Sequence, residues 1–94
     1  MLSDIPKNLS KVSKTDIDKE IARVGMIAEL DAVNLYEQLA VIAQDPGLKN
    51  VLLDIAKEEK THIAEFETVL LRKDPQQVVE NAKGKEEVEE IFGK

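Results

Sequence analysis

The stretch Lys57-Glu58-Glu59-Lys60-Thr61-His62 is the centre around which the chain is organised, because it sets Glu59 and His62 three residues apart. At the 100° per residue of an α-helix, Glu59 falls near the middle of an apolar stripe and His62 lies beside it. Burying an unpaired carboxylate costs several kcal/mol, so these two side chains need a partner. The stripe consists of Leu48, Leu52, Ile55, Ile63, Phe66 and Leu70.

Glu29 occupies the same kind of position on an upstream helical pattern. The partner that we expect for these three groups is a bound metal ion, and protonation is the alternative. Because the chain has no cysteine, oxygen and imidazole must hold any metal, and these ligands suit iron, manganese or zinc. The apolar residues on the face of Glu29 are Ala22, Met26, Ala32, Val33, Tyr36 and Ala40.

The apolar periodicity predicts an all-α fold, in which an antiparallel two-helix hairpin is followed by a short C-terminal helix. The first helix is expected over 15–44, with Thr15 or Ser13 as its N-cap, and the second over 46–72. Asp45-Pro46 separates the two long helices, since Asp caps a helix and Pro fits its first position. The connection is short, which favours antiparallel neighbours.

Outside the hairpin, residues 1–14 are predicted to be an extended or mobile leader. Asp74-Pro75 repeats the capping device, and a short helix or tail is expected over 75–92, interrupted at Gly84. The whole chain, 1–94, is therefore expected to form a single half-bundle domain.

The net charge and the N-terminus exclude several classes of protein. The chain of 94 residues has 13 Lys+Arg against 19 Asp+Glu, and this net charge of -6 opposes binding to nucleic acid. No signal peptide and no apolar run long enough to span a membrane is present in the sequence. We therefore expect a soluble, intracellular protein with no nucleic-acid or membrane partner.

The apolar surplus of the first helix favours an oligomer. Met26, Ile27, Leu30 and Val41 lie outside its main stripe, as in a helix that is buried on more than one side. That stripe consists of Ile17, Ile21, Val24, Ala28, Ala32, Leu35, Leu39 and Ile42. Two helices cannot enclose a core, so we expect hairpins to dimerise into a four-helix bundle. The alternative is that these are scattered exposed apolar residues.

The ligand count leads to the same dimer. A Glu on one helix and Glu-x-x-His on another are half of the ligand set of di-metal carboxylate proteins. The chain has one histidine, so a full site requires Glu29, Glu59 and His62 from each of two chains. Alone, Glu-x-x-His is a weak motif, and a single histidine beside an apolar stripe can be a hydrogen-bonded core residue. The acidic residues expected on solvated faces are Glu37, Glu58, Glu65, Glu67 and Glu80, of which Glu58 or Glu65 could contact the ligands.

Two segments together resemble the encapsulated ferritin family, and in particular archaeal members fused to the encapsulin shell. The first is Ile27-Ala28-Glu29-Leu30-Asp31-Ala32-Val33-Asn34-Leu35-Tyr36-Glu37-Gln38, and the second is Glu58-Glu59-Lys60-Thr61-His62. The resemblance implies a hairpin that dimerises to form a di-iron ferroxidase centre between subunits, within a ring that is typically a decamer. It also implies oxidation of Fe(II) by dioxygen and delivery of Fe(III) to an encapsulin nanocompartment in the cytoplasm.

By position, Glu29, Glu59 and His62 match the family's catalytic di-iron ligands, and Tyr36 matches a tyrosine beside the centre. Asp31 matches one carboxylate of an outer metal site that guides iron inward, but the companion glutamate is replaced by Ala28. Two alternatives remain at this point. One is a non-catalytic acidic helical interaction module, and the other is a rubrerythrin-like peroxidase, which needs a second Glu-x-x-His and usually a cysteine-ligated site.

Overall fold

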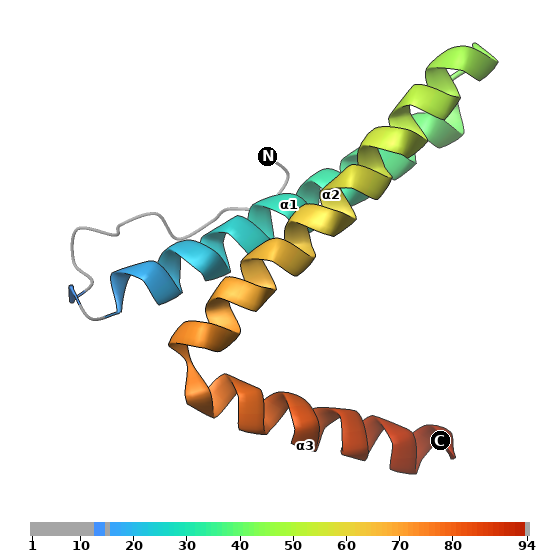
Figure 1. Ribbon diagram of the computed structural model, residues 1–94. Helices are drawn as coiled ribbons and strands as arrows, with labels where there is room; N and C mark the ends of the chain where they lie inside the picture. Colours follow the sequence, from blue (N-terminus) through green and yellow to red (C-terminus); the bar gives the residue numbers. More distant parts are fainter. Residues whose placement is uncertain (1–12, 15, 94) are drawn as a thin grey trace.

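The computed structural model describes residues 13–14 and 16–93, which form three helices: α1 (Ile17–Ile42), α2 (Pro46–Lys73) and α3 (Pro75–Phe92). Within these residues there is no strand, and the predicted all-α fold is confirmed. Helices α1 and α2 lie side by side as an antiparallel hairpin, and α3 turns away from it at the far end of α2 (Figure 1). The chain is therefore a long hairpin with a projecting third helix.

The turn between α1 and α2 follows the predicted capping chemistry. Asp45 is the N-cap of α2, and its carboxylate accepts a hydrogen bond of 3.0 Å from the backbone N–H of Gly47. Pro46 takes the first helical position, where its missing N–H leaves no bond unmade. Helix α1 ends at Ile42, two residues before the expected end.

The start of α1 differs from the prediction. The N-cap position belongs to Asp16, and Ser13 lies before it; Thr15 is outside the described residues, as is the leader up to residue 12. The Asp16 carboxylate does not cap the helix. It accepts a hydrogen bond from Lys19 at 3.0 Å and another from the Ser13 hydroxyl at 3.0 Å. Mainly through the bond from Lys19, these contacts lower the pKa of Asp16 below its ordinary value.

The predicted interruption at Gly84 is wrong, because α3 runs without a break through this residue to Phe92. A glycine in an exposed helix lowers its stability by only about 1 kcal/mol relative to alanine, which neighbouring helix-forming residues can offset. Gly93 instead ends the helix, with a left-handed φ of 83°.

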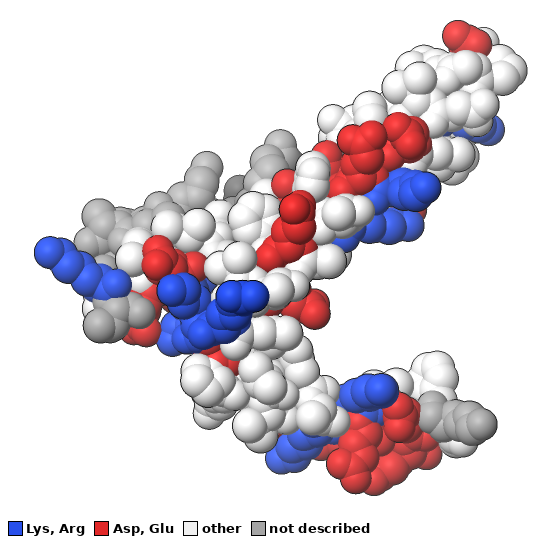
Figure 2. Space-filling model, in the orientation of Figure 1, with Lys and Arg blue, Asp and Glu red and all other residues white. Residues whose placement is uncertain are grey.

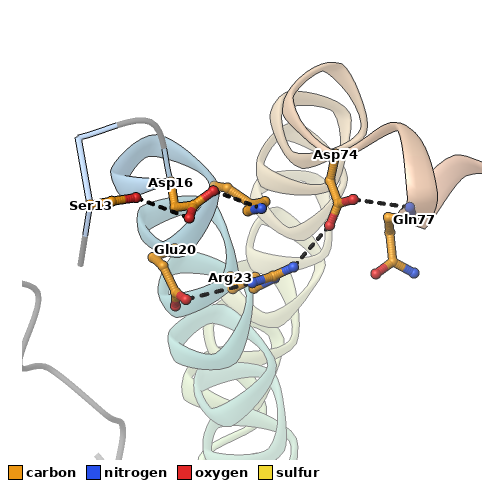
Figure 3. A network of polar contacts seen from close by, with 7 residues as sticks. Ser13, Asp16, Glu20, Arg23, Asp74 and Gln77 are labelled. Atoms are coloured by element: carbon orange, nitrogen blue, oxygen red, sulfur yellow. Dashed lines mark hydrogen bonds and ion pairs between the residues drawn. The ribbon is translucent and has the colours of Figure 1, made fainter. Parts of the chain in front are cut away.

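Three residues hold the start of α3, and we call them the α3 joint: Arg23 of α1, Asp74 between α2 and α3, and Gln77 of α3 (Figure 3). Asp74 accepts a 2.8 Å bond from Arg23 of α1 through one oxygen and a 3.2 Å bond from the Gln77 backbone N–H through the other. One buried carboxylate thus caps α3 and ties it to the hairpin.

The hairpin has a small core for its length. Its buried apolar residues are Ala22, Val33, Ala40, Ala56 and Leu70, most of them alanine. None of the residues of α3 is buried, and its apolar side chains at Val79, Ile91 and Phe92 are more than two-thirds exposed. No described helix is long and apolar enough to cross a membrane.

Candidate metal centre

Glu29, Glu59 and His62 meet in the middle of the hairpin. Glu29 comes from α1, whereas Glu59 and His62 are one turn apart on α2 and therefore project to the same side. Their nearest donor atoms all lie within 4.8 Å of one another. The structure thus brings together the three residues that the sequence predicts as metal ligands.

The imidazole of His62 faces both carboxylates through Nδ1. This atom lies 3.3 Å from Oε2 of Glu59 and 3.5 Å from Oε2 of Glu29. Because Nδ1 carries at most one proton, it cannot donate to both, and both distances exceed the usual 2.7 to 3.2 Å of an N–H···O bond. Two ligands held side by side on one ion at about 2.1 Å are themselves about 3.0 to 3.5 Å apart, which matches these separations.

One carboxylate oxygen of Glu29 is left without a hydrogen bond inside the hairpin. Its Oε2 is buried, and no described residue forms a hydrogen bond with it; the contact with Nδ1 of His62 is too long to be one. A buried, unsatisfied carboxylate oxygen is destabilising by about 1 to 3 kcal/mol or more. A cation at this point would compensate for that energy, and two carboxylates with one imidazole are a donor set that suits iron, manganese or zinc. The three residues therefore fit a metal ion.

The centre is accessible on one side. The side chains of Glu29 and Glu59 are 21% and 18% exposed, whereas that of His62 is 45% exposed. His62 thus lies at the edge of the hairpin. A partner that approached along this edge of α2 would reach the cluster directly.

The other two predicted site residues lie outside this cluster. Asp31 follows Glu29 by two residues, so it lies about 200° around α1, and it is buried at 8% exposure. Tyr36 follows Glu29 by seven residues and lies on the same stripe of α1, two turns away and partly buried. The roles of Asp31 in an outer metal site and of Tyr36 beside the centre stay predictions.

The acidic residues assigned to solvated faces fit that assignment. Glu58, Glu65, Glu67 and Glu80 are exposed. Glu37 is half-exposed and forms a 3.1 Å ion pair with Lys60 on the other helix of the hairpin. In the part of the chain that the structure describes, neither Glu58 nor Glu65 belongs to the cluster of donor atoms.

The sequence analysis did not find the α3 joint. The Asp74-Pro75 signal predicted the cap of α3, and the observed bond to Gln77 agrees with it. The ion pair with Arg23 joins residues 51 positions apart and depends on how α1 packs beside the end of α2. No local spacing could have indicated it.

A helical hairpin that carries Glu on one helix and Glu-x-x-His on the other has the arrangement of a ferritin-like carboxylate protein. A model of the EncFtn-like family matches residues 4–84. The chain therefore belongs to the EncFtn-like family, and the resemblance to encapsulated ferritins is confirmed.

Three relatives support this assignment. A "Ferritin-like-encapsulin shell fusion protein" of Pyrococcus furiosus is 53% identical over 74 residues, which are 79% of this chain and 21% of the relative. The "Encapsulin nanocompartment cargo protein EncC" of Myxococcus xanthus is 35% identical over 79 residues, which are 84% of this chain and 58% of the relative. The crystal structure of the encapsulated ferritin domain from Pyrococcus furiosus matches with a TM-score of 0.79 and 44% identity, over all of this chain and 90% of the other.

The chain therefore spans about a fifth of the Pyrococcus fusion protein and somewhat more than half of the Myxococcus cargo protein. The domain structure from Pyrococcus is matched over 90% of its length, and the helices that the structure describes share its ferritin-like helical fold.

Proposed function

We propose that this protein is a ferroxidase, which oxidises Fe(II) to Fe(III) with dioxygen at a di-iron site formed between two subunits. The observation that carries the proposal is the convergence of Glu29, Glu59 and Nδ1 of His62 around a buried, unsatisfied carboxylate oxygen. Iron is the substrate in this reaction. The Fe(III) that the reaction produces is stored in an encapsulin nanocompartment.

The donor set fits this chemistry. Hard carboxylate oxygens favour Fe(III) over Fe(II), so they promote loss of an electron from iron. Two Fe(II) ions lose one electron each, and a dioxygen molecule that takes both electrons and two protons leaves as hydrogen peroxide. Glu29 and Glu59 would neutralise most of the added positive charge, and the imidazole of His62 would complete the binding of iron.

The need for two subunits follows from the number of ligands. One chain offers two carboxylates and one imidazole at the centre, whereas a two-fold pair offers four carboxylates and two imidazoles, the ligand set of a di-iron site. The edge of α2 that carries His62 is suited to such pairing. Val51 and Val69 lie within about 20° of His62 around the helix and are 55% and 44% exposed.

The printed names of two relatives support a proposal for the location of the protein. One is named as a fusion with an encapsulin shell and another as encapsulin cargo. We therefore propose that this chain lies inside a cytoplasmic encapsulin nanocompartment, with the shell protein as its partner. From the family resemblance alone, we propose that it forms a ring-like homo-oligomer, a decamer. Asp31 is proposed to belong to an outer iron site, and Tyr36 to donate a hydrogen bond near the centre.

A helical interaction module is the competing function, and the exposed apolar side chains of α3 favour it. Figure 2 shows acidic side chains gathered on the later half of α3, whereas its first half carries little charge. An interaction module would bind a partner through this helix and would take up no stoichiometric metal.

The test is the rate of Fe(II) oxidation in air, followed by the absorbance of Fe(III). Glu29→Ala and His62→Ala should each slow the reaction roughly 100-fold or more, because each removes a ligand from both halves of the site. Glu65→Ala is the matched control on the exposed face of α2 and should react like the parent. Ligand variants that are folded and oligomeric and still oxidise Fe(II) at the parental rate would contradict the proposal.

A further inference from the structure

We propose that Gly25 and Phe66 are positioning residues for the metal centre, which set the separation at which Glu29 can meet Glu59 and His62. This inference rests on the proposed function, because it concerns the same three ligands. It assigns a role to a glycine in the middle of a long helix, where glycine is otherwise unfavourable by about 1 kcal/mol relative to alanine.

The aromatic ring of Phe66 lies directly against the backbone of α1 at Gly25. A Cβ atom added to Gly25 would lie 2.7 Å from both Cδ1 and Cε1 of Phe66 and 2.8 Å from Cζ. Three ring atoms at this distance mean that the ring occupies the space of a side chain. Only glycine fits α1 at this point without a shift of the ring or of the helix.

This contact lies one helical turn from the centre on both helices. Gly25 precedes Glu29 by four residues, and Phe66 follows His62 by four. Because α1 and α2 are antiparallel, both steps run the same way along the hairpin and amount to about 6 Å. Gly25 and Phe66 thus face each other in the same register as Glu29 and His62.

The separation of two packed helices depends on the side chains at their contact, and it is smallest where one of them is glycine. The ligands are sensitive to this separation, since metal sites require ligand distances within about 0.2 Å of the ideal values. A Cβ at Gly25 would lie less than 3.0 Å from the ring of Phe66, and a shift of α1 that relieves this contact would move Glu29 relative to His62. The close contact therefore sets the distance between Glu29 and His62, although neither Gly25 nor Phe66 binds the metal.

The experiment is Co(II) binding, measured by titration calorimetry and by the visible spectrum of the bound ion, which reports its coordination. Gly25→Ala should weaken Co(II) binding about tenfold or more and change the spectrum, with helical content unchanged by circular dichroism. Gly84→Ala is the matched control, because nothing lies within 4 Å of its added Cβ, and it should bind like the parent. Adding Phe66→Leu to Gly25→Ala makes room for the Cβ and should restore most of the lost affinity.

Parental affinity and spectrum in Gly25→Ala would overturn the inference and leave the proposed function intact. If Gly25→Ala does not fold, Phe66→Leu alone takes its place, since it creates no clash. It should weaken Co(II) binding severalfold, and parental binding by this variant would likewise overturn the inference. A parent protein that binds no Co(II) would contradict both the proposed function and the role of Gly25.

Discussion

Glu29 and Asp74 are two largely buried carboxylates of the same hairpin, and they differ in what surrounds them. Asp74 has a partner for each oxygen, Arg23 on one side and the Gln77 N–H on the other, as Figure 3 shows. Glu29 has a buried oxygen that forms no hydrogen bond with any described residue. A carboxylate whose partners are all within the chain serves the fold, whereas one without them is available to a ligand.

The largest effect is expected on metal affinity, when the carboxylate of Glu29 is neutralised. Glu29→Gln keeps the size of the side chain and removes the charge, so metal affinity should fall roughly 100-fold or more. The free energy of unfolding of the metal-free protein should stay within about 1 kcal/mol of the parent, because no hydrogen bond of Oε2 is lost. Metal titration and urea unfolding at equal protein concentration measure the two effects.

Neutralising Asp74, the carboxylate with two hydrogen-bond partners, should lower stability and leave metal affinity unchanged. Asp74→Asn weakens the bond to Arg23 and is expected to reduce the free energy of unfolding by about 1 to 2 kcal/mol, since Arg23 is partly exposed and can be hydrated. Metal affinity should be unchanged, because Asp74 lies twelve residues, about 18 Å of helix, beyond His62.

The matched control for Asp74→Asn is Glu89→Gln. It removes an exposed ion pair with Lys85 at 3.9 Å and should change the free energy of unfolding by less than about 0.5 kcal/mol. Equal stability of Asp74→Asn and Glu89→Gln, or a loss of metal binding in Asp74→Asn, would show that the two buried carboxylates do not have separate roles.

The exposed ion pair between Glu37 of α1 and Lys60 of α2 shows how much burial adds to the stabilising effect of an ion pair. Glu37→Gln removes the charge from the 3.1 Å contact with Lys60. The side chain of Glu37 is 45% exposed and that of Lys60 is 60% exposed. We expect a loss of about 0.2 to 1 kcal/mol, which added salt should reduce. Urea unfolding at low and high salt tests this, and a loss larger than that of Asp74→Asn would contradict the importance of burial.

The smallest effect is expected at Asp16, whose side chain is half-exposed and whose contacts are local. Because its bond from Lys19 lowers its folded-state pKa, its contribution to stability is present above its unfolded pKa of about 3.9 and is lost as the pH falls through the lower folded value. The melting temperature of Asp16→Asn should thus be slightly below that of the parent at pH 6 and converge with it near pH 2. A difference that persists at pH 2 would contradict this account.

Much of the fold followed from local patterns in the sequence. The Asp-Pro pairs at Asp45 and Asp74 predicted both helix starts, because capping and the fixed φ of proline act over a few residues. The break expected at Gly84 was wrong, because the propensity of one glycine is too small to end a helix by itself.

The convergence of Glu29, Glu59 and His62 could also be predicted, because the two carboxylates stand out on apolar stripes and His62 lies beside one of them. The contacts that support it could not. The Gly25 and Phe66 contact and the Arg23 and Asp74 ion pair join residues from different helices, and they depend on the register of the hairpin, which spacing within one helix does not determine.

The most direct test of the central claim is native mass spectrometry combined with metal analysis after anaerobic loading with Fe(II). The account predicts an even number of chains and one iron per chain, with both features lost together when dimers are dissociated. Monomers that hold no stoichiometric iron, or monomers that oxidise Fe(II) at the undiminished rate, would contradict a di-iron site shared between two subunits.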